Sequence, residues 1–172
     1  MVRHFGNTNE TPKVNGSLAE NGCGKFADIN DAALISLRKL GITHLWLTGI
    51  LEQASSTAYP ERPADSPLLL KGKAGSPYAI RDYFDVCPDY ATDPTKRLDE
   101  FKALLKRIKK RGLKTIIDFV PNHVARSYSS DIRPELSFGR NDDTHRSKES
   151  GNSWMRRVAF AEVLLRLLLA VS

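Results

Sequence analysis

The sequence Leu113-Lys-Thr-Ile-Ile-Asp-Phe-Val-Pro-Asn-His123 predicts a buried strand with polar groups at its C-terminal end. Residues 114–120 are rich in Ile and Val, which favours a strand, and Asp118 lies inside it. A proline then ends the strand, and Asn122 and His123 follow at the end where α/β folds bind ligands. An aspartate inside an apolar strand costs free energy unless it is paired or hydrogen-bonded, so we expect Asp118 to have a partner or a ligand.

Two helix–strand units lie along the chain. The first joins a helix over about residues 28–40, capped by Asp28 or Asn30, to a strand over residues 42–48. The near-continuous apolar character of this strand is typical of a parallel strand covered on both faces. The second joins a helix that begins at Asp93-Pro94 to the strand over residues 114–120. This alternation predicts an α/β fold with right-handed connections and a parallel sheet.

The segments around these units carry weaker patterns. Residues 50–77 contain four prolines and predict a long loop, which inside a compact domain is normally functional or disordered. Residues 1–27 are polar and glycine-rich, with room for one short strand near residues 13–15. That strand would bring the sheet to about three strands.

Three segments stand in an informative order. Residues 41–50 read Gly-Ile-Thr-His-Leu-Trp-Leu-Thr-Gly-Ile, residues 75–88 read Gly-Ser-Pro-Tyr-Ala-Ile-Arg-Asp-Tyr-Phe-Asp-Val-Cys-Pro, and residues 118–123 read Asp-Phe-Val-Pro-Asn-His. Together they resemble glycoside hydrolase family 13, the α-amylase family, over roughly residues 25–130. The first is similar to its second barrel strand, with Gly49 in place of the usual Pro. The second is similar to the Gly-Tyr-x-x-x-Asp-Tyr-x-x-Val-x-Pro loop that follows, and the third to the conserved end of strand three.

The resemblance implies a (β/α)8 TIM barrel that acts on α-glucosidic bonds with a pair of carboxylates. This chain would form an incomplete barrel, with about the first three strands and two helices. By resemblance, His123 hydrogen-bonds the sugar whose bond is cleaved, and Tyr78 stacks on its ring. Asp118 organises the site from behind, and Asn122 occupies a position that binds calcium in many α-amylases. The expected partner is an α-glucan or a small α-glucoside.

Each of these residues, taken alone, also has a purely structural explanation. His123 could be a satisfied polar residue at a strand end, and Tyr78 could be an ordinary loop aromatic. Asp118 could cap a turn or pair with a basic neighbour. Within the three-segment match the sugar-site interpretation is favoured for these three residues, whereas Asn122 stays open between calcium ligand and surface amide.

The catalytic groups of the family are not expected in this chain. By resemblance, its nucleophile, acid/base and second aspartate end strands four, five and seven, whereas this chain stops about fifty residues after strand three and a barrel needs roughly 250. Residues 140–142, Arg-Asn-Asp, have the nucleophile's Arg-x-Asp spacing, but residues 129–137 before them do not form an apolar strand. We therefore assign no catalytic residue and predict little or no activity for the isolated chain.

The C-terminal part of the chain departs from this pattern. We divide the sequence into residues 1–138, the N-terminal part of a glycosidase barrel, and residues 139–172, a polar linker with a short apolar tail. The abrupt change suggests a truncated or frame-shifted product. Residues 154–172 are interrupted by Glu162 and Arg166 and are too short to cross a bilayer comfortably, so no membrane partner is expected.

Two alternative functions remain open. The chain could be a non-catalytic sugar-binding fragment that completes a split barrel with another chain. It could also be a small α/β domain that binds nucleotide or nucleic acid, since residues 96–114 hold nine of the basic residues behind a net charge of +6. No glycine-rich phosphate loop follows a predicted strand, so nucleic acid is not an expected partner.

Cysteine content and the N-terminus give two further expectations. Cys23 and Cys87 follow no metal-ligand spacing, which argues against a zinc site or a disulfide framework. Residues 1–8 contain no apolar signal region, so we expect a cytoplasmic protein.

Overall fold

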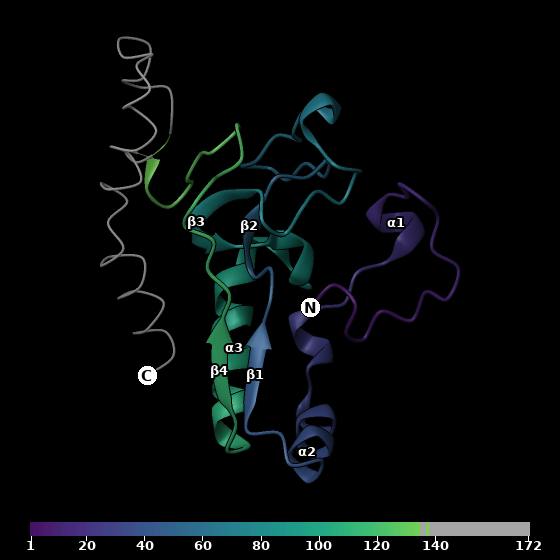
Figure 1. Ribbon diagram of the computed structural model, residues 1–172, viewed down its shortest axis with the longest axis vertical. Coiled ribbons are helices and arrows are strands. Elements are labelled where there is room, and N and C mark those ends of the chain that lie inside the picture. The colour runs from purple at the N-terminus through teal and green to yellow at the C-terminus, as the bar shows by residue number, and fades with distance from the viewer. Residues whose placement is uncertain (135–136, 138–172) are drawn as a thin grey trace.

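The computed structural model describes residues 1–134 and 137 (Figure 1). The α-helices are α1 (Leu18–Asn21), α2 (Asp31–Lys39) and α3 (Arg97–Lys110), and the strands are β1 (His44–Leu47), β2 (Leu51–Gln53), β3 (Ile80–Val86) and β4 (Lys114–Ile117). Short 3-10 turns cover residues 26–28, 67–69, 88–90 and 94–96. The predicted linker and apolar tail over residues 139–172, and the Arg-Asn-Asp run at 140–142, lie outside the described residues.

Strands β1 and β4 form a parallel pair, as the alternation of helices and strands predicts. They pair in register from His44 opposite Lys114 to Leu47 opposite Ile117. Helix α3 precedes β4 and lies behind the pair (Figure 1), and it supplies the crossover that parallel strands require. Parallel pairing is therefore confirmed for two strands, both shorter than predicted, and Asp118 lies just beyond the end of β4 instead of inside it.

The two faces of the β1–β4 pair differ in burial. On one face, Leu45 and Ile117 pack against the hydrophobic core. On the other, Trp46 and Ile116 lie opposite one another in register and are 63% and 41% exposed. The expectation that residues 42–48 are covered on both faces is therefore wrong, because nothing in the described part of the chain packs over this second face. Burial of both faces of the β1–β4 pair would require further elements packed over Trp46 and Ile116.

The main core lies between α3 and the β1–β4 pair. Phe26 is fully buried and makes an edge contact with Tyr90, with ring centroids 5.9 Å apart, and a tilted contact with Phe101 at 5.4 Å. Leu104 and Ile108 of α3 are also fully buried. These α3 positions recur every three or four residues and so share one helix face, which turns toward the core.

Helix boundaries follow local capping. The Asn30 side chain accepts a hydrogen bond from the Ala33 amide at 3.0 Å, so α2 begins after Asn30, the second of the two predicted caps, and not at residue 28. Residues 26–28 form a 3-10 turn instead. Past the end of α3, Gly112 adopts φ +70°, a left-handed conformation that glycine takes without strain.

The prediction of a long loop over residues 50–77 is wrong in part, because this segment contains β2. Strand β2 pairs antiparallel with β3, which lies in the segment that was expected to be a loop motif. β2 is only three residues long, and β3 carries charged residues that are nonetheless buried, so neither shows the apolar alternation of a strand. The short strand expected near residues 13–15 is not formed, and a turn occupies this position.

Within residues 1–134 and 137, no helix is long and apolar enough to cross a membrane.

Candidate functional site

The segment that follows β4 lies against β3. The Ala125 amide donates to the Ile80 carbonyl at 2.7 Å, and the Ser129 amide donates to the Arg81 carbonyl at 2.9 Å. Both acceptors belong to β3. Three of the four predicted site residues, Asp118, Asn122 and His123, are therefore followed by backbone that is hydrogen-bonded to a strand.

Asn122 and His123 are brought together at the surface. Both are exposed, and the Asn122 Oδ1 atom lies 2.9 Å from Nδ1 of His123. With the amide oxygen as acceptor, Nδ1 carries the proton, and Nε2 of the neutral ring becomes an acceptor. In that tautomer Nε2 can accept a hydrogen bond from a sugar hydroxyl group.

Asp118 extends the β4 ladder by one position. Its backbone amide donates to the Leu47 carbonyl at 3.5 Å. Its side chain is half-buried, and its carboxylate makes no hydrogen bond or ion pair with any described residue. The partner expected for Asp118 is thus not found within residues 1–134 and 137, and its organising role stays a prediction.

Tyr78 precedes β3 by two residues and is 44% exposed. Tyr78 lies two residues before Ile80, and His123 lies two residues before Ala125. Because the Ala125 amide donates to the Ile80 carbonyl, Tyr78 and His123 lie in the same region of the molecule. No ring contact or hydrogen bond in the described part of the chain joins their side chains. Their stacking and hydrogen-bonding roles with a sugar remain predictions.

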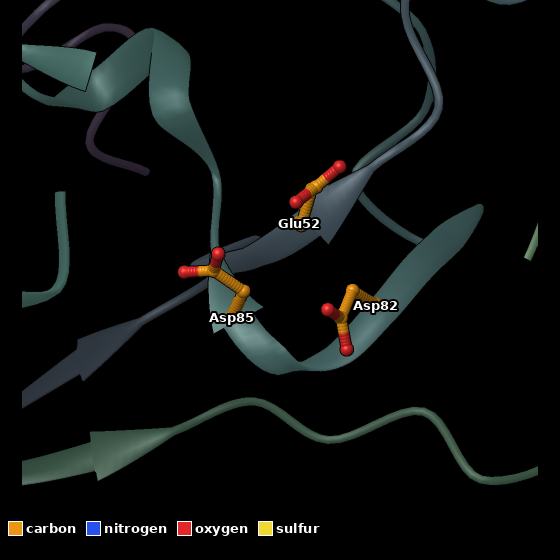
Figure 2. Close-up of side chains that lie close together, drawn as sticks. All are labelled: Glu52, Asp82 and Asp85. Carbon is orange, nitrogen blue, oxygen red and sulfur yellow. The ribbon is translucent and has the colours of Figure 1, made fainter. Parts of the chain in front are cut away.

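An acidic cluster that sequence reasoning missed lies next to this segment. Glu52 of β2 and Asp82 and Asp85 of β3 are buried, and one carboxylate oxygen from each lies within 4.8 Å of the others. Figure 2 shows the three side chains extending from the two neighbouring strands. The Asp-Tyr pair of the quoted loop motif contains Asp82 and was the one available signal, whereas nothing in the sequence marks Glu52 or Asp85 as its neighbours.

A bulge in β3 creates this cluster. Leu51 pairs with Val86 while Glu52 pairs with Asp82, so the three β3 residues between these two pairs, residues 83–85, have no counterpart in β2. Asp82 Oδ1 accepts from the Phe84 amide and Asp85 Oδ1 accepts from the Val86 amide, both at 2.7 Å. The two carboxylates therefore satisfy backbone donors at the irregular part of the ladder, which gives them a structural role.

Three arginines neutralise the cluster. The Arg62 Nε atom lies 2.6 Å from Glu52 Oε1, and Arg81 Nε lies 3.6 Å from the same oxygen. Arg97, the first residue of α3, donates from Nε to Asp85 Oδ2 at 2.7 Å. Buried carboxylates and guanidinium groups offset each other's desolvation, which makes this a closed ionic network.

The cluster does not fit a metal ion. Oxygen-only donors suit calcium or magnesium, but the ligand oxygens must be free to coordinate. Five of the six carboxylate oxygens of Glu52, Asp82 and Asp85 already lie within hydrogen-bond distance of an N–H group. The adjacent cavity, of about 10 Å³, holds a single water molecule at most. We therefore derive no metal chemistry from these residues.

Burial shifts the acidity of all three carboxyl groups. It raises the pKa of Glu52 to about 8, although Arg62 acts in the opposite direction. It raises the pKa of Asp82 to about 6, against the hydrogen bond from the Phe84 amide. The pKa of Asp85 is also raised by burial, and its hydrogen bond with Arg97 opposes the change.

We expect the free energy of unfolding to fall as the pH rises from about 4.5 to 8. Because the folded-state pKa values of Glu52 and Asp82 lie above their ordinary values, the folded protein binds these protons more tightly than the unfolded chain. Their stabilisation is present at low pH and is lost as the pH passes about 6 and then about 8. Urea unfolding at pH 5, 6.5 and 8 should show a loss on the order of 1–3 kcal/mol.

The Glu52→Gln/Asp82→Asn double variant is the control for this pH effect, since neither replacement titrates. Its stability should change less between pH 5 and pH 8 than that of the unmodified chain. A stability that rises over this interval in the unmodified chain, or an identical slope in the double variant, would contradict the assignment.

A separate cavity of about 330 Å³ lies at the N-terminal segment. It is lined partly by Asn7, Asn9 and Asn21. The Asn7 and Asn9 amides donate to the carbonyls of Asn21 and Glu20, which ties this loop together. None of the predicted site residues lines this cavity.

Comparisons with known proteins cover most of the described chain. Residues 5–147 match the family described as the alpha amylase catalytic domain. Trehalose-6-phosphate hydrolase of Bacillus subtilis (strain 168) is 32% identical over 114 residues, 66% of this chain and 16% of that protein. Maltase 1 of Drosophila virilis is 36% identical over 83 residues, 48% of this chain and 10% of that protein. The crystal structure of an alpha-amylase from Lactobacillus plantarum superposes with a TM-score of 0.56 at 28% identity, covering 87% of this chain and 33% of its own.

The matched region exceeds the three segments that carry the resemblance. It includes both Tyr78 and His123 and begins at residue 5, earlier than the 25 expected. The chain nevertheless spans only 10% to 33% of the lengths of these three proteins. The match runs to residue 147, whereas we placed a boundary after residue 138, and that boundary stays a prediction.

Proposed function

The chain belongs to the family of alpha-amylase catalytic domains, and from this premise we propose that it supplies one part of a glycosidase site for α-glucosidic sugars. In this proposal His123 accepts a hydrogen bond from the sugar or donates one to it, and Tyr78 stacks on the ring of the sugar. Asp118 organises the site behind them. The observation that carries the proposal is that the family match spans both segments while both side chains are exposed to solvent.

Binding of a maltooligosaccharide tests this role directly. We expect maltotriose, titrated into the full chain and followed by NMR, to shift the signals of Tyr78 and His123. Tyr78→Ala and His123→Ala should each weaken binding by at least roughly fivefold, because each removes one stacking or hydrogen-bonding contact. His44→Ala is the matched control, since His44 is also exposed but lies at the N-terminal end of β1. Equal losses in all three variants would refute the assignment.

We further propose that the chain alone has little or no hydrolytic activity. By resemblance, the family's catalytic carboxylates follow later barrel strands, and this sequence offers no strand context for them. The buried cluster of Glu52, Asp82 and Asp85 does not replace them, because arginines and backbone amides already occupy its oxygens. Turnover of maltooligosaccharides or trehalose above background by the purified chain would overturn this part of the proposal.

A second candidate function is completion of a barrel together with another polypeptide. The exposed pair of Trp46 and Ile116 favours it, because an uncovered apolar sheet face is stabilised when a partner covers it. Mixing the chain with a separately produced polypeptide carrying the later strands of a family barrel should shift Trp46 fluorescence to shorter wavelength. Ile116→Glu, which keeps the fluorophore and places a charge beside it, should abolish the shift if this face is the contact.

Two finer expectations stay proposals. Calcium binding through Asn122 would require further oxygen ligands, and the Asn122 Oδ1 atom here lies 2.9 Å from His123 Nδ1. A cytoplasmic location rests on the N-terminal sequence alone.

A further inference from the structure

Tyr83 extends from the β3 bulge toward the segment that follows β4. Its side chain is buried, and its ring packs against Phe119 and Tyr128 with centroids 5.3 and 6.0 Å away. Tyr83 is one of the three β3 residues between Asp82 and Val86 that have no counterpart in β2. Bulges redirect side chains in this way, and here the redirected side chain is an aromatic ring with a polar tip.

The Tyr83 hydroxyl group reaches both ends of the turn that carries His123. It donates to the Val120 carbonyl, and it also lies 3.3 Å from the His123 carbonyl. A phenol has one proton to donate, so Val120 receives the main hydrogen bond and His123 shares it weakly. Burial raises the pKa of Tyr83 to about 12, which keeps this donor protonated at neutral pH.

Phe119 and Val124, on either side of this turn, pack against the hydrophobic cluster that contains Tyr83, whereas hydrogen bonds to the turn itself are few in the described part of the chain. No backbone–backbone hydrogen bond involves residues 120–124, and the next one along the chain joins Ala125 to Ile80. The side chains at positions 121–123 are all exposed, so packing does not fix them either. The hydrogen bond from the Tyr83 hydroxyl group thus joins this turn to β3.

We propose that Tyr83 is a positioning residue, whose hydroxyl group fixes the Val120–His123 turn and thereby the imidazole of His123. This rests on the proposed function for the consequence in sugar binding, whereas the fixing of the turn does not depend on it. A turn that is ordered before the sugar arrives loses less conformational freedom on binding, which strengthens binding without a new contact.

The Tyr83→Phe variant of the full chain tests the proposal, because it removes the hydroxyl and keeps the ring. Without sugar, the order parameters of the Asn122 and His123 amides, measured by NMR relaxation, should fall from about 0.85 to below about 0.6. Amide exchange of Ala125 should accelerate roughly five- to tenfold. Tyr90→Phe is the matched control: Tyr90 is equally buried but lies in the core beside Phe26, and both readouts should stay unchanged.

The sugar arm uses a double-mutant cycle with maltotriose. Tyr83→Phe should weaken binding at least roughly threefold in the unmodified chain, but not in a His123→Ala background, because the hydroxyl acts through His123. An equal loss in both backgrounds, or unchanged relaxation of residues 122 and 123, would overturn the positioning role. If the unmodified chain binds no maltotriose while Tyr83→Phe still loosens the turn, the proposed sugar binding fails and the positioning of the turn stands.

Discussion

Above pH 8, where the Glu52 carboxyl group is ionised, Arg62→Ala is expected to lower the free energy of unfolding by about 3–5 kcal/mol, the cost of removing one partner from a buried ionic network. The Arg62 side chain is 3% exposed and pairs with the carboxylates of Glu52 and Asp65. Its guanidinium also donates to the carbonyls of Gln53 at 2.7 Å and Thr57 at 2.9 Å. Alanine would leave these buried acceptors without a donor, which costs more than the loss of an exposed pair.

Urea unfolding followed by circular dichroism measures this effect, and two variants calibrate it. Arg38→Ala, on the exposed surface of α2, should change stability by no more than about 0.5 kcal/mol. Arg62→Lys keeps the charge but loses the planar fork of donors, so it should fall between the two. A loss below about 1 kcal/mol for Arg62→Ala would show that Arg81 or water replaces the missing donors.

Phe26→Ala is expected to cost about 3–5 kcal/mol by leaving a cavity in the main core. Phe26 is fully buried between the rings of Tyr90 and Phe101, and alanine removes both aromatic contacts. A loss of this size is a large fraction of the total stability of a small domain. The unfolding midpoint in urea should therefore fall sharply, with the slope of the transition unchanged.

Two further substitutions separate cavity formation from other effects. Phe26→Leu retains most of the volume and should cost clearly less than Phe26→Ala. Val14→Ala, at a side chain that is almost fully exposed, should have no measurable effect. If Phe26→Ala and Val14→Ala were equally mild, the core assigned between α3 and the sheet would be incorrect.

Local patterns were sufficient to predict α2, α3 and the parallel pair, but not the short helix α1. The spacing of Phe101, Leu104 and Ile108 places them on one helix face, and the structure buries all three. The Ile- and Val-rich run over residues 114–120 predicted β4, although the strand ends one residue before Asp118. These features depend on neighbours within a few residues, which is why sequence periodicity reports them.

The candidate site was only partly predictable. The quoted motifs identified Tyr78 and His123, and the structure exposes both and fixes the backbone after His123 on β3. They did not identify Arg62, because the sequence pattern of a proline-rich loop does not distinguish a buried arginine from one exposed to solvent. Its burial depends on Glu52, ten residues earlier, and on β3, almost twenty residues later.

Sequence patterns alone predicted the family and the order of α2, β1, α3 and β4, and they also named the sugar contacts, which stay predictions. Those conclusions rest on motifs and periodicities that are written locally in the chain. Only the tertiary structure revealed the β3 bulge, which gathers Glu52, Asp82 and Asp85 and directs Tyr83 to the turn before Val124. The physical reason is that a bulge is set by the pairing of two distant segments, so its effect on side-chain direction cannot be read from either segment alone.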